Sequence, residues 1–302
     1  MPTALDVRNL TIKFGGFTAV DGINFTVSAG EIFGFLGANG AGKTTTIRAI
    51  CGLLTPASGE IYVNGENITS NIASIKPRIG YMSQKFTLYQ DLTVKENILF
   101  SGALYNMSEK ESLERMKELF RYTGFDRNEN EIVKNLSGGT KQIISLCASI
   151  LHNPDIIFLD EPTAGISPVS RVLFWELIRK LSGDGKTVFV TTHYMDEAEY
   201  CGRIALMQSG KIIGLDSPEE LKKKTFTNPL YEIDVNKERR DDFEKLVSEK
   251  QIGDLSVYGL HYHLEIKNES EWEKLEKSWL ASYKKIAPSL EDVFIKMTKA
   301  GS

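Results

Sequence analysis

The stretch "IFGFLGANGAGKTTT", residues 32–46, decides the fold. Its second half fits the phosphate-loop pattern G-x-x-x-x-G-K-[ST], with four residues in the fixed positions: Gly37, Gly42, Lys43 and Thr44. The apolar run before the loop predicts a strand. The residues after it predict a helix, because apolar side chains recur at helical spacing at Ile47, Ile50, Cys51 and Leu54. A chance glycine turn would not explain both flanks.

The composition of this loop suits phosphate groups. Glycines let successive backbone N–H groups turn inward around an anion. The Lys43 ammonium would bind the β- and γ-phosphates, and the Thr44 hydroxyl is a hard oxygen ligand for Mg²⁺. The predicted nucleotide-binding residues of the loop are Gly37, Asn39, Gly40, Ala41, Gly42, Lys43, Thr44 and Thr45.

Phosphoryl transfer also needs carboxylates, and "IIFLDEP", residues 156–162, supplies two at a strand end. Asp160 is predicted to hold Mg²⁺ through water. Glu161 is predicted to orient the attacking water, a contribution of roughly 10²–10⁴ in rate. A pair of helix-capping acids is the ordinary interpretation of such a motif, but the phosphate loop upstream argues against it.

The remaining strands and helices point to an α/β protein. Continuous apolar runs at 32–36, 156–160 and 187–192 predict a parallel sheet covered on both faces. Alternating stretches at 5–14, 23–27 and 60–65 predict a smaller antiparallel sheet. Residues 91–122 are predicted to be helical, with Ser108 as a cap and one apolar face made by Leu113, Met116, Leu119 and Phe120.

The composition changes near "GLDSPEELKKKTFTNP", residues 214–229. Ser217 and Pro218 are predicted to start a short helix whose last turn carries Lys222 to Lys224, so this lysine run is a solvated helix end. Beyond it we predict an α+β domain of strand-helix-strand-strand-helix-strand-helix order. The predicted domains are 1–215 and 216–302.

Bulk properties exclude several classes. Thirty-six Lys and Arg against 40 Asp and Glu give a net charge of -4, so no global field attracts nucleic acid or acidic lipid. Three distant cysteines, Cys51, Cys147 and Cys201, indicate reduced thiols. We expect no signal peptide and no membrane-spanning segment, since the apolar runs fall short of about 20 residues.

A second glycine motif, "NLSGGT" at 135–140, completes an ordered series. The phosphate loop is followed by Gln84 in "IGYMSQ", then "LSGGT", then "IIFLDEP", then His193 in "VTTHYMDEAE". Over residues 3 to about 215 this series resembles the ATP-binding subunit of an ABC transporter, with a helical subdomain at about 88–150. The resemblance implies two subunits packed head to tail, with each ATP between one phosphate loop and the other subunit's Ser-Gly-Gly motif.

The resemblance assigns further residues one by one. Ser137, Gly138 and Gly139 would contact the γ-phosphate across the dimer, on a helix that buries Ile143, Leu146, Cys147 and Ile150. Gln84 would contact Mg²⁺ and the attacking water, and His193 the γ-phosphate. The predicted catalytic residues are thus Glu161, His193 and Gln84, and the metal residues are Thr44, Gln84 and Asp160. Phe14 would stack on adenine; packing inward at a hairpin, or replacement by Phe17, are the alternatives.

Two positions depart from the family pattern. Thr140 stands where the family has glutamine, with little expected loss. Ser167 stands where the family has aspartate; before Pro168 it can still cap a helix, but the negative charge that links the two sites is lost. We hypothesise weaker coupling between the sites.

The C-terminal segment resembles one branch of the family, the export ATPases. "PSLEDVFIKMT", residues 288–298, resembles the end of ABC-2 type export ATPases. In the preceding strand His261 and His263 alternate onto one face, where either a solvated surface or metal ligands could lie; the first interpretation is favoured because no third ligand is near.

The chain is predicted to be an ATPase subunit that uses ATP and Mg²⁺ and drives a separate membrane permease. The transporter is predicted to be an exporter, with this subunit at the cytoplasmic face of the membrane. Its ATPase partner would be a second copy or a relative. Phe86, Leu88 and Tyr89 could grip the permease or belong to the core. The alternative is a soluble ABC-type ATPase that acts on ribosome or DNA. DNA-acting types carry a long coiled coil between the glutamine and the Ser-Gly-Gly motif, and the span from Gln84 to Ser137 is too short for one. A GTPase is disfavoured because the sequence has no N-K-x-D motif.

Overall fold

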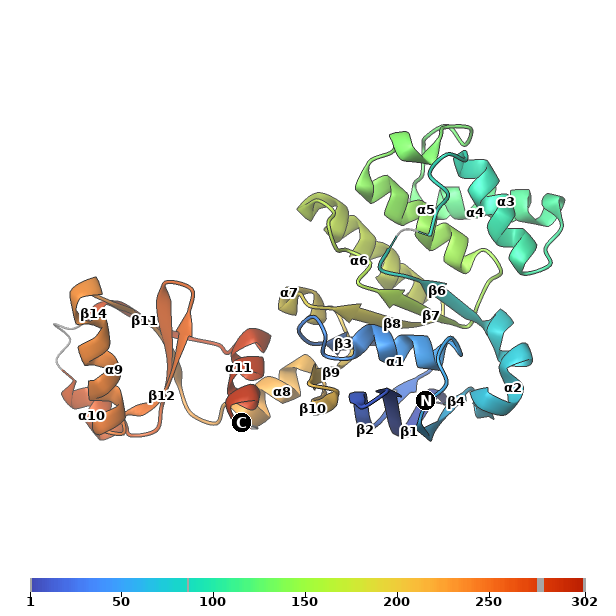
Figure 1. Cartoon of the computed structure of the whole chain (residues 1–302). Coiled ribbons are helices and arrows are strands. Elements are labelled where there is room, and N and C mark those ends of the chain that lie inside the picture. The colour runs from blue at the N-terminus through green and yellow to red at the C-terminus, as the bar shows by residue number, and fades with distance from the viewer. Residues whose placement is uncertain (1, 86, 276–279, 301–302) are drawn as a thin grey trace. The chain divides into compact units, whose positions relative to one another are not determined.

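The computed structural model describes residues 2–85, 87–275 and 280–300 (Figure 1). The chain divides into two compact units, Met1–Ser217 and Pro218–Ser302. That the second unit is an independent domain stays a prediction.

The first unit is built on a six-stranded sheet in the order β10-β9-β3-β8-β7-β6. Its strands are β3 (Ile32–Leu36), β6 (Ile79–Met82), β7 (Ile156–Asp160), β8 (Thr187–Thr192), β9 (Arg203–Gln208) and β10 (Lys211–Asp216). All neighbours pair in parallel except β9 and β10. Every residue of β7 and β8 is buried, as the continuous apolar runs predicted.

A second, antiparallel sheet has the order β2-β1-β4-β5. Its strands are β1 (Thr3–Phe14), β2 (Phe17–Ser28), β4 (Ser58–Val63) and β5 (Glu66–Asn67). Helix α1 (Lys43–Ile50) lies between the two sheets (Figure 1). Ile47 and Ile50 are fully buried there, whereas Cys51 and Leu54 follow the end of the helix and are half-buried, so the predicted helical face is shorter than expected.

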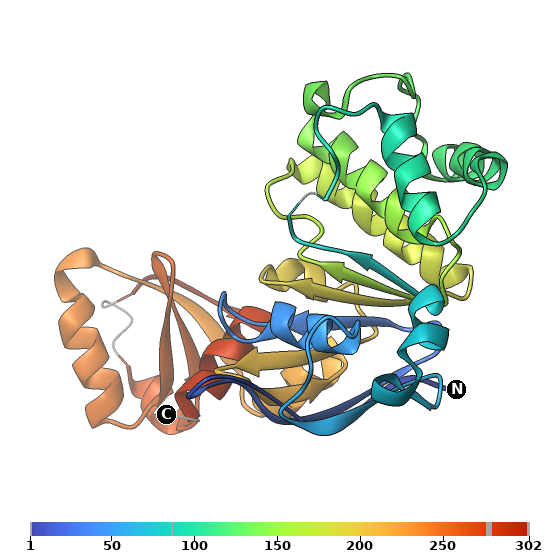
Figure 2. The same cartoon turned by 45° about the vertical axis from the view of Figure 1, so that its right-hand side comes forward.

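Helices α3 (Val94–Leu104), α4 (Glu109–Thr123) and α5 (Gly138–Ile150) gather at the end of the unit away from β1 and β2 (Figure 2). Ser108 caps α4 in a capping box with Glu111, as predicted. On α5 the prediction for Ile143 is wrong, because this residue is only half-buried. Its neighbour Ile144 is fully buried instead, since the helix is covered on more sides than the one predicted face.

The other helices of the unit are α2 (Ile68–Ile75), α6 (Pro168–Gly183) and α7 (Met195–Ala198), with short 3-10 turns at Lys76–Arg78 and Val133–Asn135. The three cysteines are free thiols. Within the described ranges no helix has the length and apolarity that crossing a membrane requires.

The second unit has the predicted order of elements. After α8 (Pro218–Thr225) come β11 (Leu230–Val235), a 3-10 turn at Lys237–Arg239, α9 (Arg240–Glu249), β12 (Gly253–Tyr258), β13 (His261–Ile266), α10 (Glu269–Lys274), β14 (Leu280–Ile286) and α11 (Leu290–Ala300). The strands form an antiparallel sheet in the order β12-β13-β11-β14. One face carries the apolar core around Phe243, Tyr262 and Leu264.

The other face of this sheet is polar and is contacted by α11. His263 Nδ1 donates to Asp292 at 2.5 Å, and Lys296 of the same helix pairs with the buried Glu265. The predicted solvated face is therefore wrong for His263, which is buried because α11 covers it. His261, at the edge of this contact, is half-exposed and bonds Asp234. Among the residues described, no three His, Cys, Asp or Glu side chains are placed to hold a metal ion.

The contact between His263 and Asp292 predicts a stability effect. Burial opposes the charge of Asp292, but hydrogen bonds from His263 and Ser289 outweigh it and lower the pKa of this carboxyl. The stabilisation is therefore present above the unfolded pKa of about 3.9 and is lost as the pH falls through the lower folded value. Asp292→Asn should lower the free energy of unfolding at pH 7 by about 1–3 kcal/mol.

Urea unfolding monitored by tryptophan fluorescence would measure this change. Glu249→Gln, at the exposed end of α9, is the matched control and should change the free energy of unfolding by less than about 0.5 kcal/mol. Equal effects of the two substitutions would show that the buried pair contributes nothing.

Candidate functional site

The carboxyl ends of β3, β7 and β8 meet at one edge of the parallel sheet, as parallel neighbours must. A cavity of about 410 Å³ opens at this edge. It is lined by residues of the phosphate loop and by side chains from three other segments: Phe14, Phe17, Ala19, Asn39, Gly40, Gly42, Lys43, Thr44, Thr45, Gln84 and Glu161. Most of the predicted nucleotide-binding residues are thus gathered in one cavity.

Glycine is required at two corners of the loop. Gly42 has φ 108°, and a Cβ there would lie 2.6 Å from the Ala19 carbonyl oxygen. A Cβ at Gly37 would lie 2.3 Å from the Met207 carbonyl oxygen. Both distances are shorter than real contacts allow, so the loop can approach its neighbours only without side chains at these positions.

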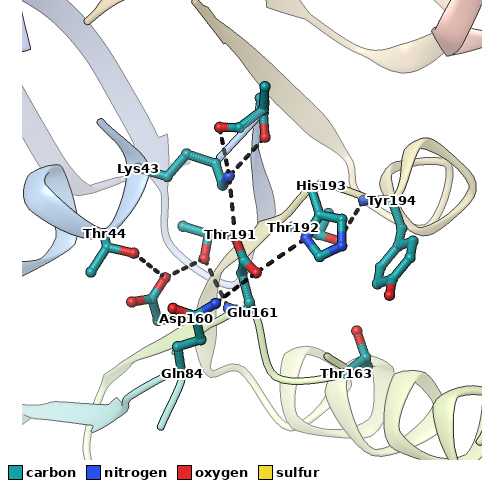
Figure 3. A network of polar contacts seen from close by, with 12 residues as sticks. Lys43, Thr44, Gln84, Asp160, Glu161, Thr163, Thr191, Thr192, His193 and Tyr194 are labelled. Atoms are coloured by element: carbon teal, nitrogen blue, oxygen red, sulfur yellow. Dashed lines mark hydrogen bonds and ion pairs between the residues drawn. The ribbon is translucent and has the colours of Figure 1, made fainter. Parts of the chain in front are cut away.

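Lys43 is buried and directed back across the loop. Its Nζ donates to the carbonyl oxygens of Gly37 at 2.7 Å and Ala38 at 3.2 Å. It also lies 3.2 Å from Glu161 Oε1 (Figure 3). The ammonium group therefore connects the phosphate loop to the carboxylate that follows β7.

Asp160 is fully buried and only partly satisfied. Its Oδ1 accepts from Thr191 at 2.6 Å and from Thr44 at 3.1 Å, while Oδ2 has no hydrogen-bond partner. Burial raises the pKa of Asp160, and the two hydroxyl donors oppose this. A buried carboxylate oxygen without a partner, beside the Thr44 hydroxyl, is a donor set that suits a hard divalent cation.

Glu161 is held in a strained backbone conformation. Its φ is 47°, a left-handed value that costs a non-glycine residue about 1–3 kcal/mol. The N–H of Glu161 donates to both the carbonyl and the hydroxyl oxygen of Thr191, at 3.1 and 2.9 Å. These bonds help to maintain the conformation that turns the carboxylate toward the loop.

Three predicted residues converge on the Glu161 carboxylate (Figure 3). Gln84 Nε2 donates to Oε2 at 3.0 Å, and His193 Nδ1 donates to the same oxygen at 3.1 Å. Lys43 pairs with the other oxygen. The glutamine, the histidine and the phosphate loop come from distant parts of the sequence, so a carboxylate shared by all three is a centre of the site.

The two candidate aromatic residues face each other across the β1–β2 hairpin. Phe14 and Phe17 are register partners, 50% and 64% exposed, and both line the cavity. The alternative that Phe14 packs inward is therefore wrong. Both rings remain candidates for a stacking contact with a base.

The Ser-Gly-Gly motif does not line this cavity. Ser137 caps α5 and accepts from Thr140 N at 3.3 Å, while Gly138 and Gly139 form the first turn. A Cβ on Gly139 would lie 2.6 Å from Ser170 Oγ, which is why this position has no side chain. Ser167 caps α6 by accepting from Ser170 N at 3.2 Å, as predicted. The consequence for coupling stays a prediction.

Several contributing residues were missed from the sequence. Thr191 bonds both Asp160 and Glu161 from the end of β8, and Ala19 of β2 lines the cavity. The only signal for Thr191 was a hydroxyl residue at the end of an apolar strand. Thr163, Thr192 and Glu197 form a second buried cluster behind the site.

The segment predicted to grip a permease is divided. Leu88 is buried, whereas Tyr89 is 50% exposed and packs edge-on against the exposed Phe100 at 4.9 Å. Leu104 on the same helix is also exposed. Phe86 lies outside the described residues. One member of the cluster therefore belongs to the core and one to an exposed apolar surface.

The sheet, its phosphate loop and the carboxylates after β7 define a P-loop nucleotide-binding protein. Residues 20–164 match the family model described as ABC transporter. The chain belongs to the ABC transporter family, among its ATP-binding proteins.

Two relatives to which the chain is similar are named for multidrug transport and for linearmycin resistance. The chain is 44% identical over 226 residues to YbhF of Escherichia coli K12, a probable multidrug ABC transporter ATP-binding protein, covering 74% of this chain but 39% of that protein. It is 33% identical over 305 residues to the linearmycin resistance ATP-binding protein LnrL of Bacillus subtilis 168, covering 97% and 98%. The chain thus spans well under half the length of the first relative and nearly all of the second.

A solved structure shares the fold. The dimeric structure of MJ0796, a bacterial ABC transporter cassette, is similar with a TM-score of 0.65 and 28% identity, covering 70% of this chain and 98% of that one. This likeness is consistent with the parallel core sheet, the antiparallel sheet and the helical region of the first unit.

Both rings line the cavity, and the resemblance to the family favours Phe14 as the ring that stacks on the base. Phe14→Ala should weaken ATP binding by about 5- to 150-fold, the loss expected from removing one stacking contact of about 1–3 kcal/mol. Fluorescence titration with a nucleotide analogue would measure the dissociation constant. Phe17→Ala is the matched control; if it causes the larger loss, the stacking residue is Phe17.

Proposed function

We propose that the chain binds and hydrolyses Mg-ATP as the energising subunit of an exporter. The observation that carries this is the Glu161 carboxylate, which is oriented by Gln84, His193 and Lys43 at the phosphate loop. A protein that only held ATP would not need a carboxylate aimed at the γ-phosphate end of the loop.

The residues of the cavity fit Mg-ATP. Thr44 and Asp160 would hold the metal, the latter through water, and the loop N–H groups would bind the β-phosphate. The metal, when bound, compensates the negative charge of the transferred phosphoryl group. Glu161 would accept a hydrogen bond from the attacking water and orient it, while His193 and Gln84 would bind at the γ-phosphate end of the same cavity.

A complete site needs a second subunit. Ser137, Gly138 and Gly139 offer a helix N-terminus with backbone that can be closely approached, yet they do not line the cavity of their own chain. A second copy of this chain, or a related subunit, would supply this motif in trans. The dimeric form of the MJ0796 cassette supports this arrangement.

Coupling to transport would come through a separate membrane permease. The names of YbhF and LnrL, a probable multidrug transporter protein and a linearmycin resistance protein, favour export of a drug-like compound. The exposed apolar surface of Tyr89, Phe100 and Leu104 is a suitable contact for a permease helix, because aromatic residues are enriched at interfaces. The chain would then work at the cytoplasmic face of the membrane.

Glu161→Gln tests the proposed function. The amide cannot orient the attacking water as the carboxylate does, so we expect ATP hydrolysis to fall by roughly 10²–10⁴ while ATP binding is retained. With hydrolysis blocked, Mg-ATP should convert the monomer to a dimer, which light scattering would detect as a doubled mass.

Glu60→Gln, on an exposed strand position, is the control and should change neither rate nor mass. A wild-type rate that Glu161→Gln leaves intact would contradict the catalytic assignment. A persistent monomer that still binds ATP would contradict a sufficient homodimer and require a different partner chain.

Ser167 generates a separate prediction about coupling between the two sites. Ser167→Asp keeps the helix cap and adds the missing charge, so the Hill coefficient for ATP hydrolysis should rise from about 1 toward the limit of 2 for two sites. Ser167→Asn keeps the cap without charge and should leave the coefficient unchanged. Strong cooperativity already present in the wild type, and unaltered by aspartate, would refute the hypothesis.

A further inference from the structure

Glu197 is a fully buried carboxylate that no motif of the sequence explains. It lies on the short helix α7, behind the nucleotide cavity, and is not among the residues that line it. A buried carboxylate needs hydrogen bonds or a cation to offset its loss of hydration. Its partners therefore show what the surrounding structure requires of it.

Two threonine hydroxyls donate to Glu197, one to each oxygen. Thr163 Oγ1 donates to Oε1 at 2.6 Å, and Thr192 Oγ1 donates to Oε2 at 2.6 Å. Both bonds are short, as expected for donors to a charged acceptor. The carboxylate thus connects the segment after β7 to the end of β8.

Arg171 of α6 provides the nearest positive charge. Its Nε lies 3.3 Å from Glu197 Oε1, and its guanidinium carbon lies 4.0 Å from the centre of the Tyr194 ring. The cluster therefore joins three elements, the segment after β7, the segment after β8 and helix α6, through one carboxylate.

The two threonines are close in sequence to Glu161 and His193, the two residues of the polar network that the proposed function places at the γ-phosphate (Figure 3). Thr163 is two residues after Glu161, whose left-handed φ of 47° must be maintained by its surroundings. Thr192 immediately precedes His193, and its hydroxyl also accepts from Tyr194 N at 3.0 Å. One carboxylate thus holds the backbone next to both residues.

We propose that Glu197 is a positioning residue for hydrolysis, which fixes Glu161 through Thr163 and His193 through Thr192. The inference rests on the proposed function, since both residues are assigned there to the reaction. Glu197 does not touch the nucleotide. Its loss should therefore lower turnover and leave ATP affinity, set by the phosphate loop and the aromatic ring, almost unchanged.

The test uses the full chain and four substitutions. Thr163→Val and Thr192→Val each remove one hydroxyl without changing volume, Glu197→Ala removes both bonds, and Glu197→Gln keeps the shape and one acceptor oxygen. Each valine variant should lower kcat about 10-fold and Glu197→Ala about 10²-fold, the scale of a small misplacement of catalytic groups. Glu197→Gln should recover most of the lost rate.

Glu31→Gln is the matched control, because Glu31 is a part-buried carboxylate of the same unit that pairs with Arg203 rather than with Thr163 or Thr192. It should leave kcat and ATP affinity unchanged. A fall in kcat and ATP affinity together, tracking the loss of thermal stability, would overturn the inference in favour of a purely structural role. Unchanged kcat in both valine variants would overturn it as well.

Amide hydrogen exchange separates this inference from the proposed function. Without nucleotide, exchange at Ala164 and Tyr194 should be faster in Glu197→Ala. This variant keeps the acceptors of both N–H groups, Glu161 O and Thr192 Oγ1, but removes the carboxylate that holds their segments. If the wild-type chain shows no ATPase activity that Glu161→Gln abolishes, the proposed function is contradicted, but the positioning role is not. Unchanged exchange at both amides would defeat the positioning role, whatever the activity.

Discussion

Two adjacent carboxylates are buried at the end of β7, and the surrounding structure is arranged to compensate their charge. Ionised side chains taken out of water are costly unless donors or cations surround them. Asp160 receives hydroxyl donors from Thr44 and Thr191, and Glu161 receives Gln84, His193 and Lys43. These partners come from three segments, the phosphate loop, Gln84 and the end of β8. Satisfying one pair of acids therefore aligns the phosphate loop with two other segments of the unit.

The same constraint explains the division of labour along the sheet. Strands β7 and β8 are apolar through most of their length and end in Asp160 and in Thr191–Thr192, so the polar side chains meet at one edge of the sheet. The Ser-Gly-Gly motif belongs to the helical region, where Gly139 lies close to Ser170 of α6, and it does not line the cavity of its own chain. Under the proposed function, a second subunit would bring this motif to the cavity.

Sequence reasoning reached the strands, the phosphate loop and the carboxylates because each is encoded locally. Five consecutive apolar residues or a fixed glycine spacing need no knowledge of distant partners. It failed where the deciding partner was remote in sequence. His263 was predicted to be solvated because the local pattern does not show Asp292, the partner 29 positions away that covers it. Glu197 was given no role because its partners Thr163 and Thr192 lie on other segments. Ile143 and Ile144 could not be ranked because helical periodicity does not say how many sides are covered.

The bonds around Lys43 bear on which anions the loop accepts. The ammonium group already has Glu161 and two main-chain carbonyls as partners within the chain. A phosphate group can bind Lys43 only if these internal bonds break. The free energy lost with them therefore weakens the binding of the phosphate. A single orthophosphate offers fewer contacts to offset this loss than a polyphosphate chain, which is long enough to reach Lys43 and several loop N–H groups together. We therefore expect the internal compensation of one lysine to disfavour small inorganic anions relative to polyphosphate chains.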